Sequence, residues 1–448
     1  MTGRGPPPGL PRLILPGGPL SLAGHFDAYG PLPLGSGSGG RAWPGDGRMI
    51  AEVERAGLAG RGGAGFPAGR KLRAVADSSR AAGARRGQGG AVVVANGAES
   101  EPASAKDKML LARAPHLVLD GIAVAADAVG ATRGYLSLHP GSDELARQLT
   151  AAVTERARLD RVAVQIVAGG PGYLASQETA LVSHLNGGQP KPTFVPPRPF
   201  EKGAHGRPTL VANVETLAHI ALIARFGADW FREVGEAGEP GRRGAPGSAL
   251  VTVSGAVRRP GVYEIALGLP VGQLIEWAGG PSEQPQAILA GGYLGGWLPY
   301  GEALNVPVTD QALRAAGAAL GPGVLVVLPQ SACPLAETAW IAGYLASQSA
   351  RQCGPCSNGL PALAGTLRQI AFGRPDARAL GWAEQLMTLV NGRGACHLPD
   401  GTAGFVASAL AVFSGELHRH GASGPCPRTR RRPLLPAPGY GSAPGRHQ

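Results

Sequence analysis

Three cysteines have a spacing that could bind a metal or carry redox chemistry. Cys353 and Cys356 form the motif Cys-Gly-Pro-Cys, and Cys396 follows after a 39-residue spacer. A thioredoxin-type dithiol needs a βαβ context, which the helical pattern of this region does not provide. A zinc site could add His397, although adjacent ligands strain a tetrahedral geometry. An iron–sulfur cluster takes thiolates from two loops, so the spacing favours a cluster, with zinc and unligated thiols as alternatives.

A glycine-rich stretch, 57-GLAGRGGAGFPAG-69, has the composition of a loop that binds phosphate. Gly60, Gly62 and Gly65 spell G-x-G-x-x-G, but in a dinucleotide-binding Rossmann unit this motif leaves a strand and enters a helix. The preceding segment, 47–58, has apolar residues at helical spacing instead. The ordinary Rossmann interpretation is therefore excluded, which leaves a phosphate loop of another kind or a flexible linker.

Alternating strands and helices must position this loop. The sequence predicts helices over 47–58, 69–82, 115–130, 143–157 and 213–227, and strands over 91–96, 134–139 and 162–168. This alternation is typical of an α/β domain with a mostly parallel sheet, which we expect over residues 46–235. The loops after two of the strands, 96–102 and 169–179, lie where such sheets bind ligands.

The chain changes character after a Gly/Pro/Arg-rich linker at 236–248. Short strands at 250–255, 260–265 and 286–292 and a helix at 271–280 predict a small β-grasp-like module over 249–325. A helical domain with the cysteine motif follows over 335–420. The Pro/Gly/Ser-rich start, 1–45, is expected to be a flexible extension, and the basic end, 421–448, a disordered tail.

Composition limits the class of protein. The 448 residues are 44% hydrophobic, and the content of glycine (71) and proline (41) is below that of a low-complexity chain. The net charge of +11 favours acidic or phosphate-bearing ligands, or reflects an arginine-rich coding bias. Five cysteines without a signal peptide predict reduced thiols in the cytosol. The most apolar helical segment, 116–131, contains two aspartates, which argues against a membrane span.

The motifs occur in an order that resembles one known family, the NADH-binding flavoprotein (51 kDa-type) subunit of respiratory complex I and of related hydrogenases and formate dehydrogenases. The similar segments cover about residues 46–420, and they are 57-GLAGRGGAGFPAGRK-71, 96-NGAESEPASAKD-107, 173-YLASQETAL-181, 192-PTFVPPRPFEKGAHGRPTLVANVETL-217 and 352-QCGPCSNG-359. The resemblance implies an α/β fold with a Rossmann-like flavin and nucleotide domain, a soluble-ligand-binding β-grasp (SLBB-like) module and a C-terminal helical bundle. In this family the glycine loop lies between helices, and its backbone amides line a site shared by NADH and FMN.

The resemblance also implies cofactors and partners. These are FMN, NAD(H) or NADP(H), and a [4Fe–4S] cluster, so that hydride passes from the nicotinamide to FMN and single electrons pass on to the cluster. The implied partner is a thioredoxin-like [2Fe–2S] subunit or a ferredoxin-type acceptor. No nucleic acid and no membrane span are expected, and the implied location is the cytoplasm, peripheral to a membrane complex in some members.

The family's site residues carry over to matching positions in this chain. The nucleotide site would be lined by Gly60, Arg61, Gly62, Gly63 and Gly65, with Phe66 stacked on adenine and Lys71 on phosphate. Ribose or flavin edges would be polarised by Asn96, Glu99 and Glu101, and the flavin would be lined by Tyr173, Glu178 and Asn213. Glu101 and Glu178 are the expected catalytic residues, and Cys353, Cys356 and Cys396 the expected cluster ligands.

The cluster end of the chain departs from the family pattern. Ala350 stands where the family has its first cluster cysteine, so three of the four thiolates remain. Ser349 or His397 could complete the ligand set, or the cluster could keep an open iron or be absent.

The acidic end departs as well. Ala98 replaces an aspartate of the acidic segment, and Gln177 replaces one of two paired glutamates. Because this acid is missing and Arg61 and Arg70 are nearby, the sequence does not decide whether the chain binds NADH or NADPH. These departures sustain a second hypothesis, a non-catalytic scaffold that docks partners with degenerate cofactor sites, with or without zinc.

Overall fold

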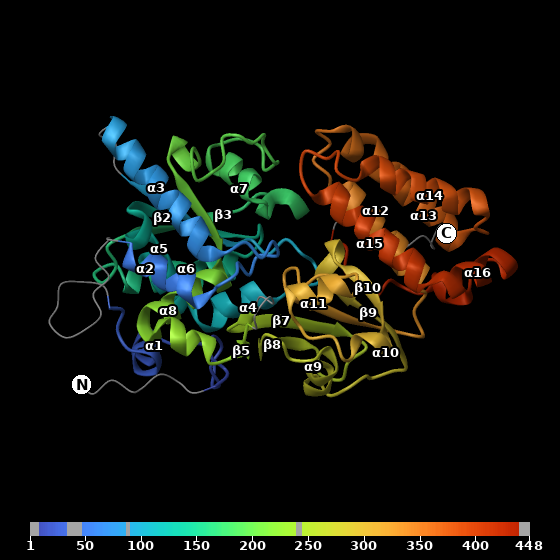
Figure 1. The fold of residues 1–448 in the computed structure, drawn as a ribbon, viewed down its shortest axis with the longest axis horizontal. Helices are drawn as coiled ribbons and strands as arrows, with labels where there is room; N and C mark the ends of the chain where they lie inside the picture. The colour runs from blue at the N-terminus through green and yellow to red at the C-terminus, as the bar shows by residue number, and fades with distance from the viewer. Residues whose placement is uncertain (1–8, 34–46, 87–89, 239–243, 439–448) are drawn as a thin grey trace.

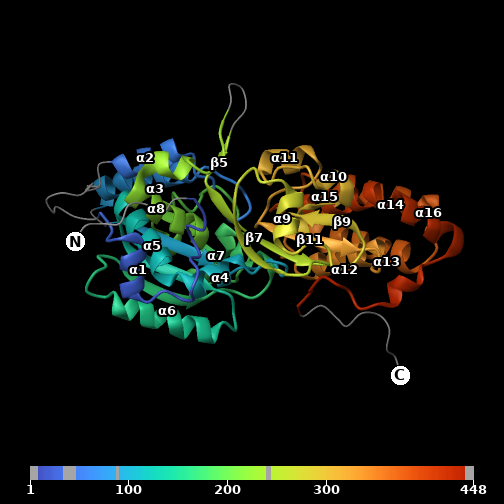
Figure 2. The same cartoon turned by 90° about the horizontal axis from the view of Figure 1, so that it is seen from below.

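The computed structural model describes residues 9–33, 47–86, 90–238 and 244–438. These residues form an N-terminal α/β domain, a β-rich module and a C-terminal helical domain; in Figure 1 the α/β domain lies on the left, and the module lies below the helical domain on the right. The view turned by 90° shows the module between the other two parts (Figure 2). The predicted fold class is confirmed.

A parallel sheet forms the centre of the α/β domain. Its strands lie in the order β3 (Ala163–Ala168), β2 (Ala131–Leu138), β1 (Ala91–Gly97) and β4 (Thr209–Asn213), and all neighbours are parallel. β1 begins with the run Ala-Val-Val-Val-Ala, which is buried throughout, as expected for a central strand covered on both faces. β4, which the hydrophobic pattern did not reveal, completes the sheet beside β1.

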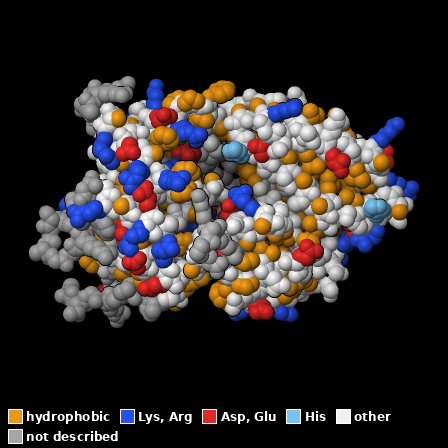
Figure 3. Space-filling model, viewed as in Figure 1, with side chains coloured by type: hydrophobic (Ala, Val, Ile, Leu, Met, Phe, Trp, Pro, Cys, Tyr) orange, Lys and Arg blue, Asp and Glu red, His pale blue; other side chains and the backbone are white. Residues whose placement is uncertain are grey.

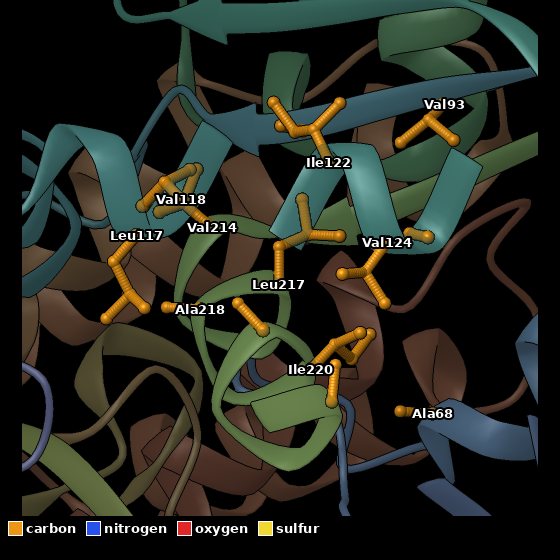
Figure 4. Packing of buried hydrophobic residues seen from close by; sticks show 14 of the residues in the cluster. Ala68, Val93, Leu117, Val118, Ile122, Val124, Val214, Leu217, Ala218 and Ile220 are labelled. Atoms are coloured by element: carbon orange, nitrogen blue, oxygen red, sulfur yellow. The ribbon is translucent and has the colours of Figure 1, made fainter. Parts of the chain in front are cut away.

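Helices α5 (Pro115–Val129) and α8 (Val214–Arg232) pack against each other beside this sheet. Ile122 of α5 and Leu217 and Ile220 of α8 lie in their contact (Figure 4). A Cβ at Gly121 would lie 2.1 Å from the carbonyl oxygen of Leu217, so the two backbones approach closely at a position that only glycine can occupy.

The remaining helices of the domain surround this core. They are α2 (Arg48–Ala56), α3 (Ala68–Arg86), α4 (Lys106–Arg113), α6 (Asp143–Glu155) and α7 (Glu178–Leu185). Among the described residues no single helix has the length and apolar character needed to cross a membrane, although the bent pair of α4 and α5 passes that test on length and composition together.

Residues 9–33 pack onto the α/β domain, which corrects the expected flexible extension over this part; 1–8 and 34–45 lie outside the described residues. The segment contains helix α1 (Leu22–Tyr29), and Leu13 is fully buried in the core. Glu264 Oε2 accepts hydrogen bonds from the backbone N–H groups of Arg12 (2.9 Å), Leu13 (2.8 Å) and Ile14 (3.4 Å). A carboxylate 250 residues away thus holds a segment whose composition alone suggested disorder.

The module is built on a mixed sheet with the order β10-β9-β11-β7-β8. Its elements are β7 (Ser248–Gly255), β8 (Gly261–Ala266), α9 (Val271–Trp277), β9 (Pro285–Ala290), β10 (Gly296–Pro299), α10 (Tyr300–Ala303), α11 (Asp310–Ala315) and β11 (Val324–Pro329). Successive residues of a strand face opposite sides. Ile288 and Val327 therefore pack in the module's own core, whereas Leu289 and Val326 pack with the helical domain.

The helical domain consists of α12 (Pro334–Ser347), α13 (Leu360–Phe372), α14 (Ala377–Val390), α15 (Leu398–Val412) and α16 (Ser414–Ser423). The described part of the expected disordered tail, 421–438, is ordered by specific contacts, and 439–448 lie outside the described residues. Glu337 accepts hydrogen bonds from the backbone N–H groups of Leu434 (2.8 Å) and Leu435 (3.3 Å), and Leu435 is buried. The basic composition of the segment does not reveal this contact, because its partner, the buried carboxylate of Glu337, is distant in the sequence.

Candidate functional site

The glycine-rich stretch forms a closed loop between α2 and α3. Backbone hydrogen bonds join Gly60 N to Phe66 O and Ala68 N to Leu58 O, both at 2.9 Å. Gly63 (φ 108°) and Gly65 (φ 63°) have positive φ angles that favour glycine. The loop is thus a built turn rather than a flexible linker, and it leads into a helix N-terminus, the arrangement that suits an anion.

The loop lies over the carboxyl end of the parallel sheet and beside the module. A Cβ at Gly62 would lie 3.3 Å from Asn213 Cβ, at the end of β4. A Cβ at Gly63 would lie 3.6 Å from the backbone of Gly321, which precedes β11. The surface is hollowed between the α/β domain and the rest of the molecule, with charged side chains of both signs at the border (Figure 3). Ligands of open α/β sheets bind at this end of the strands.

Arg61 does not offer its side chain to a ligand, which corrects part of its expected role. Its Nη2 donates to Ser248 O at 2.9 Å, its Nε lies 3.8 Å from Glu215 Oε1, and the side chain is buried. Its backbone N–H donates to Thr216 Oγ1 at 2.8 Å. Arg61 therefore ties the loop to α8 and β7. Of the two arginines that made NADPH an alternative to NADH, only Arg70 has an exposed side chain.

Phe66 and Lys71 are accessible beside the loop. The Phe66 side chain is 55% exposed, an unusual position for a large apolar ring. Lys71 Nζ lies 3.0 Å from Glu178 Oε2, and both side chains are partly exposed. The loop therefore presents a free aromatic face and a cation that is paired with a carboxylate on α7.

The acidic segment after β1 is directed inward. Glu99 accepts hydrogen bonds from Ser104 Oγ (2.5 Å) and from the backbone N–H groups of Asp107 (3.1 Å) and Lys108 (3.3 Å). It therefore satisfies the first turn of α4, where free backbone donors favour a carboxylate. This finding assigns Glu99 a structural role and differs from the expected contact with ribose or flavin.

Glu101 joins all three parts of the molecule. Its Oε2 accepts hydrogen bonds from Tyr173 Oη (2.9 Å) and from the backbone N–H of Tyr293 in the module (3.0 Å). The rings of Tyr173 and Tyr293 both pack edge-on against Tyr344 of α12. Burial raises the pKa of Glu101 to about 7, against the opposing effect of these hydrogen bonds.

Asn96 and Asn213 lie at the carboxyl ends of the neighbouring strands β1 and β4. Asn96 Nδ2 donates to Ser176 O at 2.8 Å, which fixes the loop after β3. Asn213 caps α8 through its Oδ1, which accepts the Glu215 N–H at 3.0 Å, and its Nδ2 donates to Asp107 Oδ2 at 2.7 Å. The structure thus brings both amides to the end of the sheet beneath the glycine loop.

A buried charge network that the sequence did not single out supports these amides. Lys106 Nζ donates to Asp107 Oδ1 (2.7 Å), Glu215 Oε2 (2.8 Å) and Asn213 Oδ1 (3.4 Å). Burial raises the pKa of Asp107 to about 6, whereas the Lys106 ammonium lowers the pKa of Glu215 to about 2 against the effect of burial. The sequence signal that could have revealed this network was the adjacent pair Lys106-Asp107 at the end of the acidic motif.

The three expected cluster cysteines come together in the helical domain. The Cys356 thiol is buried and hydrogen-bonds with the thiols of Cys396 and Cys353, which raises its pKa. The same bond to Cys356 lowers the pKa of Cys396 to about 6. Cys356 lies in the π-helical turn Pro355–Gly359, and Cys396 directly precedes α15. Three sulfurs from two segments form a donor set for a soft metal or an iron–sulfur cluster.

No nitrogen or fourth sulfur joins this triad within the described residues. Ala350 is buried at the position of the family's first cysteine. The His397 side chain is fully exposed, with Nδ1 3.5 Å from Asp400, which removes the zinc set that required His397. Ser349 Oγ donates to Cys356 O at 3.4 Å. The residues present therefore fit a cluster held by three thiolates.

Three family profiles match the chain in the order of its structural parts. They are the Nuo51 FMN-binding domain over residues 53–222, the SLBB domain over 250–296, and the NADH-ubiquinone oxidoreductase-F iron–sulfur binding region over 336–420.

Relatives match over most of the chain. The second F-type subunit of the NADH-quinone oxidoreductase of Rhizobium meliloti (strain 1021) is 33% identical over 393 residues, which are 85% of this chain and 90% of the relative. The F-type subunit of the Streptomyces coelicolor enzyme is 33% identical over 401 residues, 85% of this chain and 84% of the relative. The crystal structure of an NAD+-reducing [NiFe]-hydrogenase in the H2-reduced state matches with a TM-score of 0.74 and 30% identity. That match covers 85% of this chain and 63% of the hydrogenase chain.

Proposed function

The chain belongs to the family of F-type subunits of NADH-quinone oxidoreductase, and from this membership we propose that it is the electron-input subunit of an NADH-oxidising complex. The observation that carries the proposal is the pairing of two sites in one chain: a glycine loop at the carboxyl end of a parallel sheet, and a triad of thiols in the helical domain. A flavin or nucleotide site alone would suit many oxidoreductases, whereas the thiol triad adds a way to pass electrons onward.

The nucleotide and flavin would bind along the glycine loop and the strand ends below it. The backbone of Gly60, Gly62, Gly63 and Gly65 would approach phosphate, and Phe66 would stack on the adenine ring. Asn96, Tyr173 and Asn213 would border the flavin. FMN, when bound here, accepts a hydride from NADH and releases electrons one at a time.

Lys71 and Glu178 would act as an exchangeable pair. In the structure they lie 3.0 Å apart at a partly exposed position. A phosphate that binds Lys71 would compete with Glu178, because both are anions that seek the same ammonium group. Glu178 would then be released toward the nicotinamide and flavin, where a carboxylate orients polar ring atoms.

Glu101 would control a proton near the flavin. Its pKa of about 7 lets the carboxyl group exist in both protonation states near neutral pH. Its bond to Tyr173 couples that proton to a residue expected to border the flavin.

The thiols Cys353, Cys356 and Cys396 would hold the iron–sulfur cluster. A cluster takes up single electrons when bound, and three thiolates leave one iron without a protein sulfur. That iron would be labile, since weak ligation leaves it open to solvent and oxidant. The electrons would leave through a thioredoxin-like [2Fe–2S] subunit or a ferredoxin-type acceptor, because the relatives are subunits of larger complexes.

The test of the nucleotide site is the affinity of the anaerobically purified protein for NADH, measured by calorimetry. We expect Lys71→Ala to weaken binding by about tenfold, the effect of losing one charge-assisted contact to phosphate. The matched control is Arg80→Ala on the same helix, which also removes an exposed ion pair, that with Asp77. Equal affinity in the wild type and Lys71→Ala would contradict the assignment of the loop.

The test of the cluster is electron paramagnetic resonance on reduced and air-exposed samples. We expect an iron–sulfur signal that air converts to a three-iron form, and a slower loss of iron in Ala350→Cys, which restores the fourth thiolate. A protein that takes up neither flavin nor iron after anaerobic reconstitution would overturn the electron-input role and leave a scaffold that docks partners.

A further inference from the structure

A second group of metal-ligating side chains lies in the C-terminal domain, and none of them belongs to the thiol triad. Cys333, Glu416, His420 and Cys426 each offer one donor atom, and the four atoms lie within 4.8 Å of one another. In a tetrahedral zinc site with bonds of 2.0–2.3 Å, the donors are about 3.3–3.8 Å apart. The group therefore needs only a small contraction to surround an ion.

Three separate segments supply these donors. Cys333 directly precedes α12, and Glu416 and His420 lie one turn apart on the same face of α16. Gly424, with φ 80°, ends α16 and turns the chain so that Cys426 returns to the helix. The arrangement is set by a helix start, a helix face and a glycine turn, each of which is well defined by the fold.

His420 is positioned as a ligand. Its side chain is fully buried, and its Nδ1 has no hydrogen-bond partner. Its Nε2 lies 3.9 Å from Cys333 Sγ, 3.2 Å from Glu416 Oε1 and 3.2 Å from the backbone N of Cys426, from which it accepts a hydrogen bond. A buried imidazole that faces two thiols and a carboxylate has the surroundings of a metal-binding histidine rather than of a core residue.

The charge of the surroundings permits a divalent cation. Arg419 and Arg428 both pair with the Glu416 carboxylate. Binding of a divalent ion by two cysteines releases two protons. The net charge of the cluster then stays unchanged, so the two guanidinium groups repel the loaded site no more than the empty one.

We propose that Cys333, His420 and Cys426, with Glu416 Oε1 as the fourth donor, form a structural zinc site. Two thiolates, an imidazole and a carboxylate are ligands that zinc accepts in a closed tetrahedral set. A cavity of 320 Å³ lies beside the group and is lined by Cys333 and Arg428. The profile of the iron–sulfur region covers residues 336–420, so Cys333 and Cys426 lie outside it.

The zinc ion would fasten the C-terminal segment to the rest of the molecule. Directly after Cys426, Arg428 Nη1 donates to Gln330 O at 2.9 Å, and the chain then runs to Glu337 on α12. Tyr293 of the module donates through its hydroxyl to Pro436 O. A metal at Cys426 would anchor the start of this segment and hold it against both α12 and the module.

The test is metal content and cobalt spectroscopy on the full chain, purified anaerobically without added metal chelators. We expect about one zinc per chain, and, after exchange, a cobalt spectrum with thiolate charge-transfer bands and the visible bands of tetrahedral coordination. Cys426→Ser should lose the zinc and keep the iron. Cys396→Ser should lose the iron and keep the zinc, which separates this site from the triad.

Two results would overturn the proposal. One is a wild-type protein that binds neither zinc nor cobalt at micromolar concentration. The other is peptide mass spectrometry of the same anaerobic sample that finds Cys333 and Cys426 joined in a disulfide. Because both measurements use the wild-type chain, the proposal can fail even if a variant does not fold, and it is independent of whether NADH binds.

Discussion

Glu101 is the titrating residue with the clearest expected effect on stability. Its pKa in the folded protein is about 7 and the ordinary Glu value is 4.5, so the folded protein binds this proton more tightly than the unfolded chain does. The stabilising contribution is complete below about pH 4.5 and is lost as the pH rises through 7. The loss between these limits is on the order of 3 kcal/mol.

Glu101→Gln should therefore gain stability relative to the wild type as the pH rises. We expect the difference in the free energy of unfolding to change in favour of the variant by about 2–3 kcal/mol between pH 5 and pH 8.5. Urea unfolding at the two pH values measures it. Glu302→Gln removes an exposed carboxylate and is the control, for which the difference should stay constant.

Arg351 is a residue in a strained backbone conformation. Its φ angle is 55°, in the left-handed region that favours glycine. We expect Arg351→Gly to raise the free energy of unfolding by about 1 kcal/mol, because a residue with a Cβ is strained in the left-handed conformation and glycine is not. Arg351→Ala removes the same side chain and keeps the strain, so thermal unfolding should show no gain in that control.

Site residues could be predicted from the sequence only where a motif named them. The glycine loop and the thiol triad were found, since both have short, fixed spacings. The side chains of Arg61 and Glu99 bond to Ser248 and to the first turn of α4, and these partners are known only once the chain is folded. Cys333 and Cys426 share no motif at all.

At the scale of elements, the contact between α5 and α8 depends on Gly121. We expect Gly121→Ala to lower the free energy of unfolding by about 1–3 kcal/mol, because the added methyl group would overlap the Leu217 carbonyl and force the helices apart. The control is Gly83→Ala in α3, where a Cβ meets nothing within 4 Å. That substitution should stabilise the protein by up to about 1 kcal/mol, since alanine favours helix. Equal destabilisation of both variants in urea unfolding would contradict the argument.

The strands and helices themselves were largely predictable. Continuous apolar runs marked the buried strands and apolar residues at helical spacing marked the helices, and both signals are local. β4 was missed because it is only five residues long and its last residue, Asn213, is also the N-cap of α8. The described parts of the two terminal segments, 9–33 and 421–438, were mispredicted because two distant carboxylates, Glu264 and Glu337, hold them in place.

At the scale of the whole molecule, Glu264 links the N-terminal segment to the module. Removal of its carboxylate frees three backbone N–H groups, which we expect to lower the local free energy of opening by about 2 kcal/mol. In Glu264→Ala, amide hydrogen exchange of residues 12–14 should therefore accelerate by roughly thirtyfold. The amides of β1 serve as the internal control. Unchanged exchange at 12–14 would show that apolar packing alone holds the segment.

The glycine loop rests against Asn213 at one point and Gly321 at another. During translation, residues 57–71 leave the ribosome long before residue 321 is made, and domains fold as they emerge. For much of the chain's synthesis the loop therefore lacks its contact with Gly321. The nucleotide site proposed here would be closed only after the module has been synthesised and docked, so a chain that ends before residue 321 would lack this contact even though its α/β domain is complete.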